Sequence, residues 1–286
     1  MVAARIVAGV RVALAVLFLW LALAGPWANM RNESFGVFDS LGGAGFGLVP
    51  VILGAAMLLV ALALAAEHDI RLGPLAVGGS QLLLTLAMAS FTTVLAFLII
   101  VHSGAFRSLN DVRGAGWGAA GACLTAYLLP QATIMGFGFA GPSTSTPLAE
   151  RDRRLLSFGV LVAGIVVVLS PLLRWFSTAD GDWTGYQPGA PRMTFILLAV
   201  GAVMAMTGAL RLRTAGVTEP AGRLAHPHLQ LMAGAAIIAP VAGWMLTDLQ
   251  RDDFSVGLGP WVALLAGAGI VAMAVVEFTR REVTAG

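Results

Sequence analysis

Eight apolar runs, each about as long as a membrane-spanning helix, constrain this chain more than any other feature of its sequence. They cover about residues 6–25, 48–66, 75–101, 115–137, 155–173, 193–210, 229–247 and 259–278. An α-helix rises 1.5 Å per residue, so about 20 residues cross the roughly 30 Å of hydrocarbon in a bilayer. Only 11% of the 286 residues are charged and 58% are hydrophobic, which is far from the composition of a water-soluble domain. We therefore expect an all-α integral membrane protein with eight transmembrane helices.

The placement of the arginines predicts the orientation of these helices. All 17 basic residues are arginine, and basic residues are enriched in the cytoplasmic loops of membrane proteins. With a cytoplasmic N-terminus, the loops on that side hold 11 of them: Arg5, Arg11, Arg71, Arg151, Arg153, Arg154, Arg211, Arg213, Arg223, Arg280 and Arg281. Both termini are therefore predicted to be cytoplasmic. The first apolar run is predicted to stay as a helix rather than to be cleaved as a signal peptide.

Matching motifs at a nearly constant spacing predict an internal repeat. Three pairs of residues in similar surroundings lie 144 to 149 positions apart, close to half the chain length: Trp117 and Trp261, Pro26 and Pro171, Gln81 and Gln230. We expect two tandem four-helix membrane repeats, residues 1–142 and 143–286. Each would hold an even number of helices, so both would have the same orientation in the membrane.

Charged side chains are scarce within the apolar runs, and this bears on function. Charged residues inside a membrane mark ion and proton pathways because burying them is costly. None lies near the middle of a run, which argues against a proton-coupled carrier. Glu277, near the end of the last run, is expected to form a salt bridge with Arg280 or Arg281 on its own helix.

Uncharged polar residues within the runs form a candidate intramembrane polar face. Gln81, Thr85 and Thr92 are spaced by four and seven residues, so they share one face of a helix. Gln131 lies beside Pro130 in the next run. This face would line the path of a neutral or lipidic substrate, or else make ordinary hydrogen bonds between and within helices.

The loops predicted on the outer side carry charged and aromatic residues. The candidate contacts of this surface are Arg31, Glu33, Trp175, Asp180, Asp182, Trp183, Arg251 and Asp252. Asp180 and Asp182 resemble the paired aspartates that bind metal in many nucleotide-sugar transferases, but Asp-Gly-Asp is also an ordinary turn sequence. Most tryptophans lie near outer helix ends, where indole rings prefer the headgroup level; they are Trp27, Trp117, Trp175, Trp183, Trp244 and Trp261.

Several classes of site find no support in the sequence. His226 and His228 lack the further ligands of a metal site, so neither a metal nor a cofactor is expected. The net charge of +2 is scattered along the chain, which does not indicate a nucleic-acid partner. No catalytic residue can be nominated.

These observations favour one function over two alternatives. The lysine-free composition and the turn at Pro26 and Trp27 resemble membrane proteins of actinobacteria in a general way, which implies a bacterial cytoplasmic membrane. The leading hypothesis is a non-enzymatic subunit or accessory factor of a cell-envelope complex, with membrane lipids and other membrane subunits as partners. The alternatives are a small carrier or flippase for a neutral or lipidic substrate, and an outer-face enzyme that uses Asp180 and Asp182.

Overall fold

Eight long helices make up most of the part of the chain that the computed structural model describes. These described residues are 2–30, 34–36, 44–68, 77–102, 112–137, 148–179, 181–187, 193–213, 226–248 and 255–283. The helices are α1 Val2–Ala24, α2 Ala44–Ala65, α3 Gly79–His102, α4 Trp117–Phe137, α5 Glu150–Leu169, α6 Thr194–Arg213, α7 His226–Asp248 and α8 Leu258–Val283. Each coincides with one of the apolar runs of the sequence.

Seven of these helices are long and apolar enough to cross a membrane, so the protein is a multi-pass helical membrane protein. Helix α4 is outside this set of seven within the described residues. Its 21 residues include Tyr127, Pro130 and Gln131, which lower its hydropathy. It nevertheless packs against α1 and α3 in the bundle. The eighth membrane span stays a prediction.

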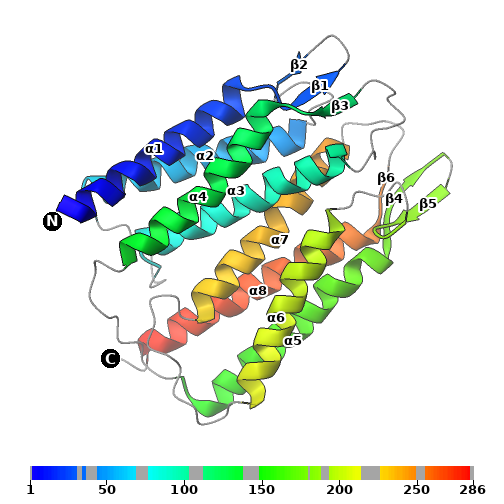
Figure 1. Cartoon of the computed structure of the whole chain (residues 1–286). Helices are drawn as coiled ribbons and strands as arrows, with labels where there is room; N and C mark the ends of the chain where they lie inside the picture. The colour runs from blue at the N-terminus through cyan, green and yellow to red at the C-terminus, as the bar shows by residue number, and fades with distance from the viewer. Residues whose placement is uncertain are drawn as a thin grey trace.

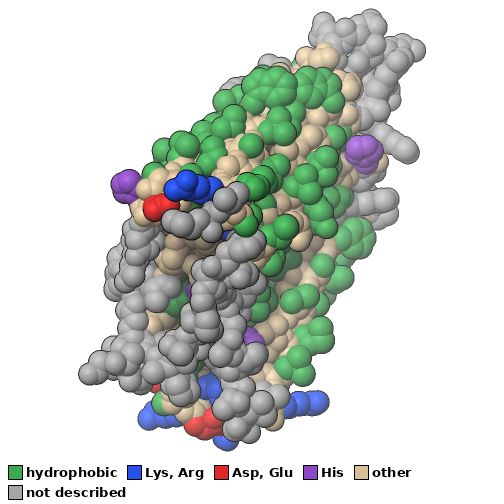
Figure 2. All heavy atoms as spheres, turned by 60° about the vertical axis from the view of Figure 1, so that its left-hand side comes forward, with side chains coloured by type: hydrophobic (Ala, Val, Ile, Leu, Met, Phe, Trp, Pro, Cys, Tyr) green, Lys and Arg blue, Asp and Glu red, His purple; other side chains and the backbone are tan. Residues whose placement is uncertain are grey.

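Large apolar side chains on the outside of the bundle fit a lipid environment. Leu59, Met135 and Leu265 are 69%, 67% and 72% exposed. Figure 2 shows green side chains along the flank of the helices, whereas the blue and red side chains lie at the lower and left margins of the view. In water such a surface would cause aggregation, but in a bilayer it contacts acyl chains.

Two small β-sheets, which the sequence did not predict, lie on the bundle. The first contains β1 Ala28–Met30, β2 Ser34–Phe35 and β3 Val112–Ala115, and the second contains β4 Arg174–Thr178, β5 Gly181–Thr184 and β6 Ser255–Val256. The strand orders are β2-β1-β3 and β5-β4-β6, and all pairs are antiparallel. Figure 1 shows both sheets at one end of the bundle and both termini at the other. We call these the sheet end and the terminal end.

A buried tryptophan attaches each sheet to the helix that precedes it. The Trp27 indole nitrogen donates to the Ala22 carbonyl at 3.0 Å, and Trp175 donates to Ser170 at 3.1 Å. Both rings are fully buried. Each carbonyl oxygen of these tryptophans then accepts the amide of a glycine just before the fourth helix of its half, Gly116 at 2.8 Å for Trp27 and Gly257 at 2.7 Å for Trp175.

This shared geometry changes the residue correspondence that the sequence indicated. The glycines Gly116 and Gly257 occupy equivalent places, whereas the sequence comparison had paired Trp117 with Trp261. Trp117 follows its glycine directly, but Trp261 lies four residues beyond Gly257. The two rings therefore sit about one helical turn apart relative to the sheets.

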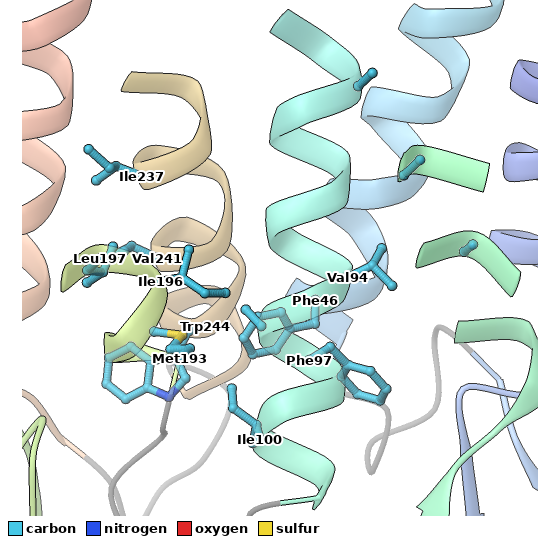
Figure 3. Close-up of a cluster of buried hydrophobic side chains, with 14 of the residues drawn as sticks. Phe46, Val94, Phe97, Ile100, Met193, Ile196, Leu197, Ile237, Val241 and Trp244 are labelled. Carbon is cyan, nitrogen blue, oxygen red and sulfur yellow. The ribbon is translucent and has the colours of Figure 1, made fainter. Parts of the chain in front are cut away.

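The two halves of the bundle pack together mainly through α3 and α7, with α2 also against α7. Figure 3 shows Phe46 and Phe97 on one side of this contact and Ile237, Val241 and Trp244 on the other. These side chains belong to one continuous core that reaches both halves. At the sheet end, Phe97 packs on Trp27 with ring centroids 5.0 Å apart, and Trp244 packs on Trp175 at 5.3 Å.

Substitution of the two equivalent glycines by alanine should destabilise the protein. A Cβ at Gly116 would lie 2.2 Å from the Pro26 carbonyl oxygen, and one at Gly257 would lie 2.2 Å from that of Arg174. We expect Gly116→Ala and Gly257→Ala each to cost about 1–3 kcal/mol, because the backbone must move to relieve the overlap. Thermal unfolding in detergent, followed by tryptophan fluorescence, measures the effect.

Gly9→Ala is the matched control, because a Cβ at Gly9 meets no atom within 4 Å. Alanine also has the higher helix propensity, so this variant should be at least as stable as the wild type. Equal melting temperatures for Gly257→Ala and Gly9→Ala would contradict the proposed role of the glycine contact.

Candidate functional site

The β4–β5 hairpin is the best-defined structure at the sheet end among the described residues. Ser177 pairs with Asp182, and Thr178 pairs with Gly181. Gly181 has a φ of 131°, a backbone conformation that favours glycine. Gly181 and Asp182 therefore begin the second strand of a hairpin, while the turn predicted for Asp-Gly-Asp includes Asp180, which lies outside the described residues.

Contacts across the hairpin occupy the Asp182 carboxylate. The Ser177 hydroxyl donates to it at 2.5 Å, and the Arg174 guanidinium lies 3.6 Å away. The side chains of Arg174 and Asp182 are 53% and 64% exposed, so their ion pair adds little stability in water. The contact places a positive and a negative group side by side on the exposed surface of the hairpin.

Two aromatic residues of the hairpin have different roles. Trp183 stacks on Phe176 with ring centroids 5.9 Å apart and planes at 4°, and its indole donates to the Thr178 hydroxyl at 3.3 Å. Trp175 is fully buried and bonded to Ser170. Trp175 therefore supports the hairpin from inside, which differs from the surface contact expected from sequence.

Hydrogen bonds tie the hairpin to both helices beneath it. The Gly185 amide donates to the Pro171 carbonyl at 2.7 Å, and the Thr194 hydroxyl at the start of α6 donates to the Gly185 carbonyl at 2.9 Å. The Tyr186 hydroxyl donates to the Val168 carbonyl at 3.2 Å. Partial burial raises the pKa of the Tyr186 phenol, so this group keeps its donor proton at neutral pH. The hairpin is thus a fixed extension of α5 and α6.

Five of the residues predicted to form the outer surface lie outside the described residues. They are Arg31, Glu33, Asp180, Arg251 and Asp252. Their grouping with Asp182 and Trp183 stays a prediction.

Two residues of the predicted intramembrane polar face bond within their own helix. The Thr85 hydroxyl donates to the Gln81 carbonyl at 2.9 Å, and that of Thr92 donates to the Met88 carbonyl at 3.0 Å. Gln131, on α4, is exposed on the outside of the bundle. The two hydroxyls thus bond to their own helix, as is common for threonine in membrane helices.

Several tryptophans also differ from the headgroup positions expected for them. Trp27 and Trp244 are 0% and 5% exposed, whereas Trp117 and Trp261 are 55% and 50% exposed. Of these four, Trp117 and Trp261 are exposed enough to meet headgroups at the sheet end. Three of the tryptophans are core residues because indole supplies both large apolar area and a hydrogen-bond donor.

A buried ion pair at the terminal end was not predicted from the sequence. Both guanidinium nitrogens Nη1 and Nη2 of Arg211 donate to the Glu277 carboxylate, each at 3.0 Å. The Gln230 amide adds a bond to the same carboxylate at 3.3 Å. Arg211, Gln230 and Glu277 are 5%, 1% and 0% exposed. The cluster joins α6, α7 and α8.

The pairing of Glu277 across helices corrects the expected salt bridge within α8. Its bidentate partner is Arg211, 66 positions away, while Arg280 forms an ion pair with Asp152 of α5. The signal was present in the sequence, because Arg211 and Glu277 lie at the ends of two parallel runs on the same predicted side. Charges buried in a membrane protein are retained only with such partners.

A second buried arginine lies in the first half of the chain. Arg11 of α1 is 8% exposed, and its Nη2 donates to the Thr133 carbonyl near the end of α4 at 3.0 Å. A cation there complements the negative end of the helix dipole. Arg11 thus links α1 and α4 at the terminal end.

A metal site is not found within the described residues. No group of three or more histidine, cysteine, aspartate or glutamate side chains lies close enough to hold a metal ion there.

No protein-family model matches the chain, and neither a curated protein nor a solved structure matches it. The functional argument therefore depends on the geometry alone.

Breaking the buried ion pair should be far more harmful than replacing it. We expect Glu277→Leu and Arg211→Met each to cost about 3–5 kcal/mol, because each leaves its partner buried without a counter-charge. The double variant Arg211→Met, Glu277→Leu should regain most of that stability. Equilibrium unfolding in mixed micelles, followed by tryptophan fluorescence, completes the double-mutant cycle.

The control is Arg154→Met, which removes one exposed partner of Glu150. Glu150 keeps its bond to Arg153 at 2.7 Å in that variant, so a much smaller loss is expected. If Arg211→Met is no less stable than Arg154→Met, the buried pair does not hold the three helices together.

Proposed function

We propose that the protein is a non-enzymatic subunit or accessory factor of a membrane complex in the bacterial cell envelope, and that it binds its partner through the sheet end. In this proposal it resides in the cytoplasmic membrane. The partner is another membrane protein with a soluble surface on the same side as the two sheets.

The proposal includes a tandem arrangement of two four-helix units, residues 1–142 and 143–286. The matching strand orders support it, as do the equivalent bonds of Trp27 with Gly116 and of Trp175 with Gly257. Both termini would face the cytoplasm, since they share one end of the bundle (Figure 1) with most of the arginines. The two sheets would then form one outer surface.

The observation that carries the proposal is the preformed β4–β5 hairpin. The residues that follow β5 are bonded to α5 and α6 below through Gly185, Tyr186 and Thr194. On its surface Asp182 accepts a hydrogen bond from Ser177 and lies 3.6 Å from Arg174. A surface that is ordered before binding loses little entropy when a partner docks. Charged groups also favour specific recognition through electrostatic complementarity.

The described contacts give less support to the two alternatives. A carrier would use the polar face of α3, but the Thr85 and Thr92 hydroxyls already bond within that helix. An enzyme would use Asp182, but its carboxylate bonds Ser177 and lies near Arg174. Partner recognition by the hairpin requires no change in the contacts of Asp182 with Ser177 and Arg174.

Exchange of the two hairpin charges tests the proposal while it preserves their ion pair. The double variant Arg174→Asp, Asp182→Arg keeps opposite charges across the hairpin but inverts the charge that each position offers to a partner. We expect the wild type to purify from its own membrane in a larger assembly and the variant to lose at least about tenfold in affinity for it. Native gels and mass measurement of the purified particles give the result.

The matched control exchanges an ion pair at the opposite end of the molecule, Asp152→Arg with Arg280→Asp. This variant should keep the larger assembly. Two results would count against the proposal: a wild type that purifies only as single chains or as copies of itself, and a hairpin variant that keeps its partner.

A further inference from the structure

An apolar groove runs along the surface between α5 and α8. Its volume is about 540 Å³. Its edges carry large exposed side chains, among them Phe158 and Val162 of α5 and Leu265 of α8, whereas Gly159, Ala163 and Ala266 are small residues within it. The groove exists because these small residues leave space between α5 and α8, while the larger side chains at its edges project past them.

The length of the groove matches one leaflet of a bilayer. Its lining on α8 extends from Val262 to Met273, which is about 16 Å along a helix. Half of the hydrocarbon thickness is about 15 Å. At the terminal end the Met273 side chain packs on Gly159, since its sulfur would lie 2.3 Å from a Cβ built there.

Charged residues lie just beyond the terminal end of the groove. Arg280, seven residues after Met273, forms an ion pair with Asp152, seven residues before Gly159. These spacings place the pair two helical turns from the groove, on the same sides of α8 and α5.

Two exposed arginines complete this end of the groove. Arg151 and Arg154 precede Phe158 by seven and four residues, so they lie on its face of α5. Both are exposed. Because arginine binds phosphate oxygens with several donors, the pair is suited to a phosphate at the membrane surface.

We propose that the groove binds one acyl chain of an anionic phospholipid, whose phosphate is held by Arg151 and Arg154. The apolar lining and the length of the groove fit the acyl chain, and the arginines at its terminal end fit the phosphate. Basic sites between transmembrane helices are a recurrent mode of anionic lipid binding. The proposal does not depend on the function of the sheet end.

Filling the groove from within tests the acyl-chain site. Gly269 lines the groove, and a Cβ built there meets no atom within 4 Å, so Gly269→Leu should fold and occupy the space of the chain. Gly9→Leu is the matched control, since Gly9 is also helical and open to its surroundings. We expect the wild type and Gly9→Leu to retain one phosphatidylglycerol molecule in native mass spectrometry, and Gly269→Leu to bind it at least about tenfold more weakly.

A second pair of variants tests the phosphate site. Arg151→Gln with Arg154→Gln should remove the preference for phosphatidylglycerol over phosphatidylcholine, while Arg151→Lys with Arg154→Lys should keep most of it. Both lipids are added separately to protein purified in detergent, and the melting temperature of each variant verifies folding.

Three results would overturn the proposal. The first is equal retention of phosphatidylglycerol by wild type and Gly269→Leu. The second is a wild type that binds phosphatidylcholine as tightly as phosphatidylglycerol, an outcome that needs no variant to fold. The third is a lipid-free dimer of the wild type that Gly269→Leu converts to monomer, which would make the groove a contact between two copies of the chain.

Discussion

The hydrogen bonds of two buried tryptophans determine how the chain passes from the membrane helices into the two β-sheets. A helix end leaves carbonyl groups without partners, and within or near a bilayer these must be satisfied by the protein itself. Trp27 and Trp175 each bond such a carbonyl through the indole and then accept a glycine amide through their own carbonyl. One residue thereby joins the end of a first helix, the first strand of a sheet and the start of a fourth helix. The position of each sheet, and of the hairpin charges on the second one, follows from this connection.

The same connection appears twice, but the helices below it differ between the halves. In the first half α1 and α4 come so close that a Cβ on Gly25 would lie 2.5 Å from the Cα of Gly118. In the second half the corresponding helices, α5 and α8, are separated by a groove of about 540 Å³. The second half also holds the buried Arg211–Glu277 pair. If the two halves began as copies, the first has kept tight packing and the second has gained the features that suit a ligand.

The sequence predicted the helices well and their polar contacts poorly, for a physical reason. An apolar run of about 20 residues has few alternatives in a membrane, so all eight ranges correspond to helices. The strands have only two to five residues, too few for an alternating pattern to stand out. The burial of Trp175 and the pairing of Glu277 with Arg211 depend on which helices become neighbours. Length and hydropathy fix that each helix forms, but they carry no information about which helix lies beside it.

The contacts at the two ends of α8 explain why the groove persists instead of closing. At the terminal end, Glu277 ties α8 to α6 and Arg280 ties it to α5. At the sheet end, Gly257 is bonded to Trp175, and the start of α8 packs against this tryptophan at Gly259. Because both ends of α8 are held, its middle stays apart from the middle of α5. The groove is therefore shaped before any acyl chain enters it, and a preformed site binds its ligand at a smaller cost in ordering.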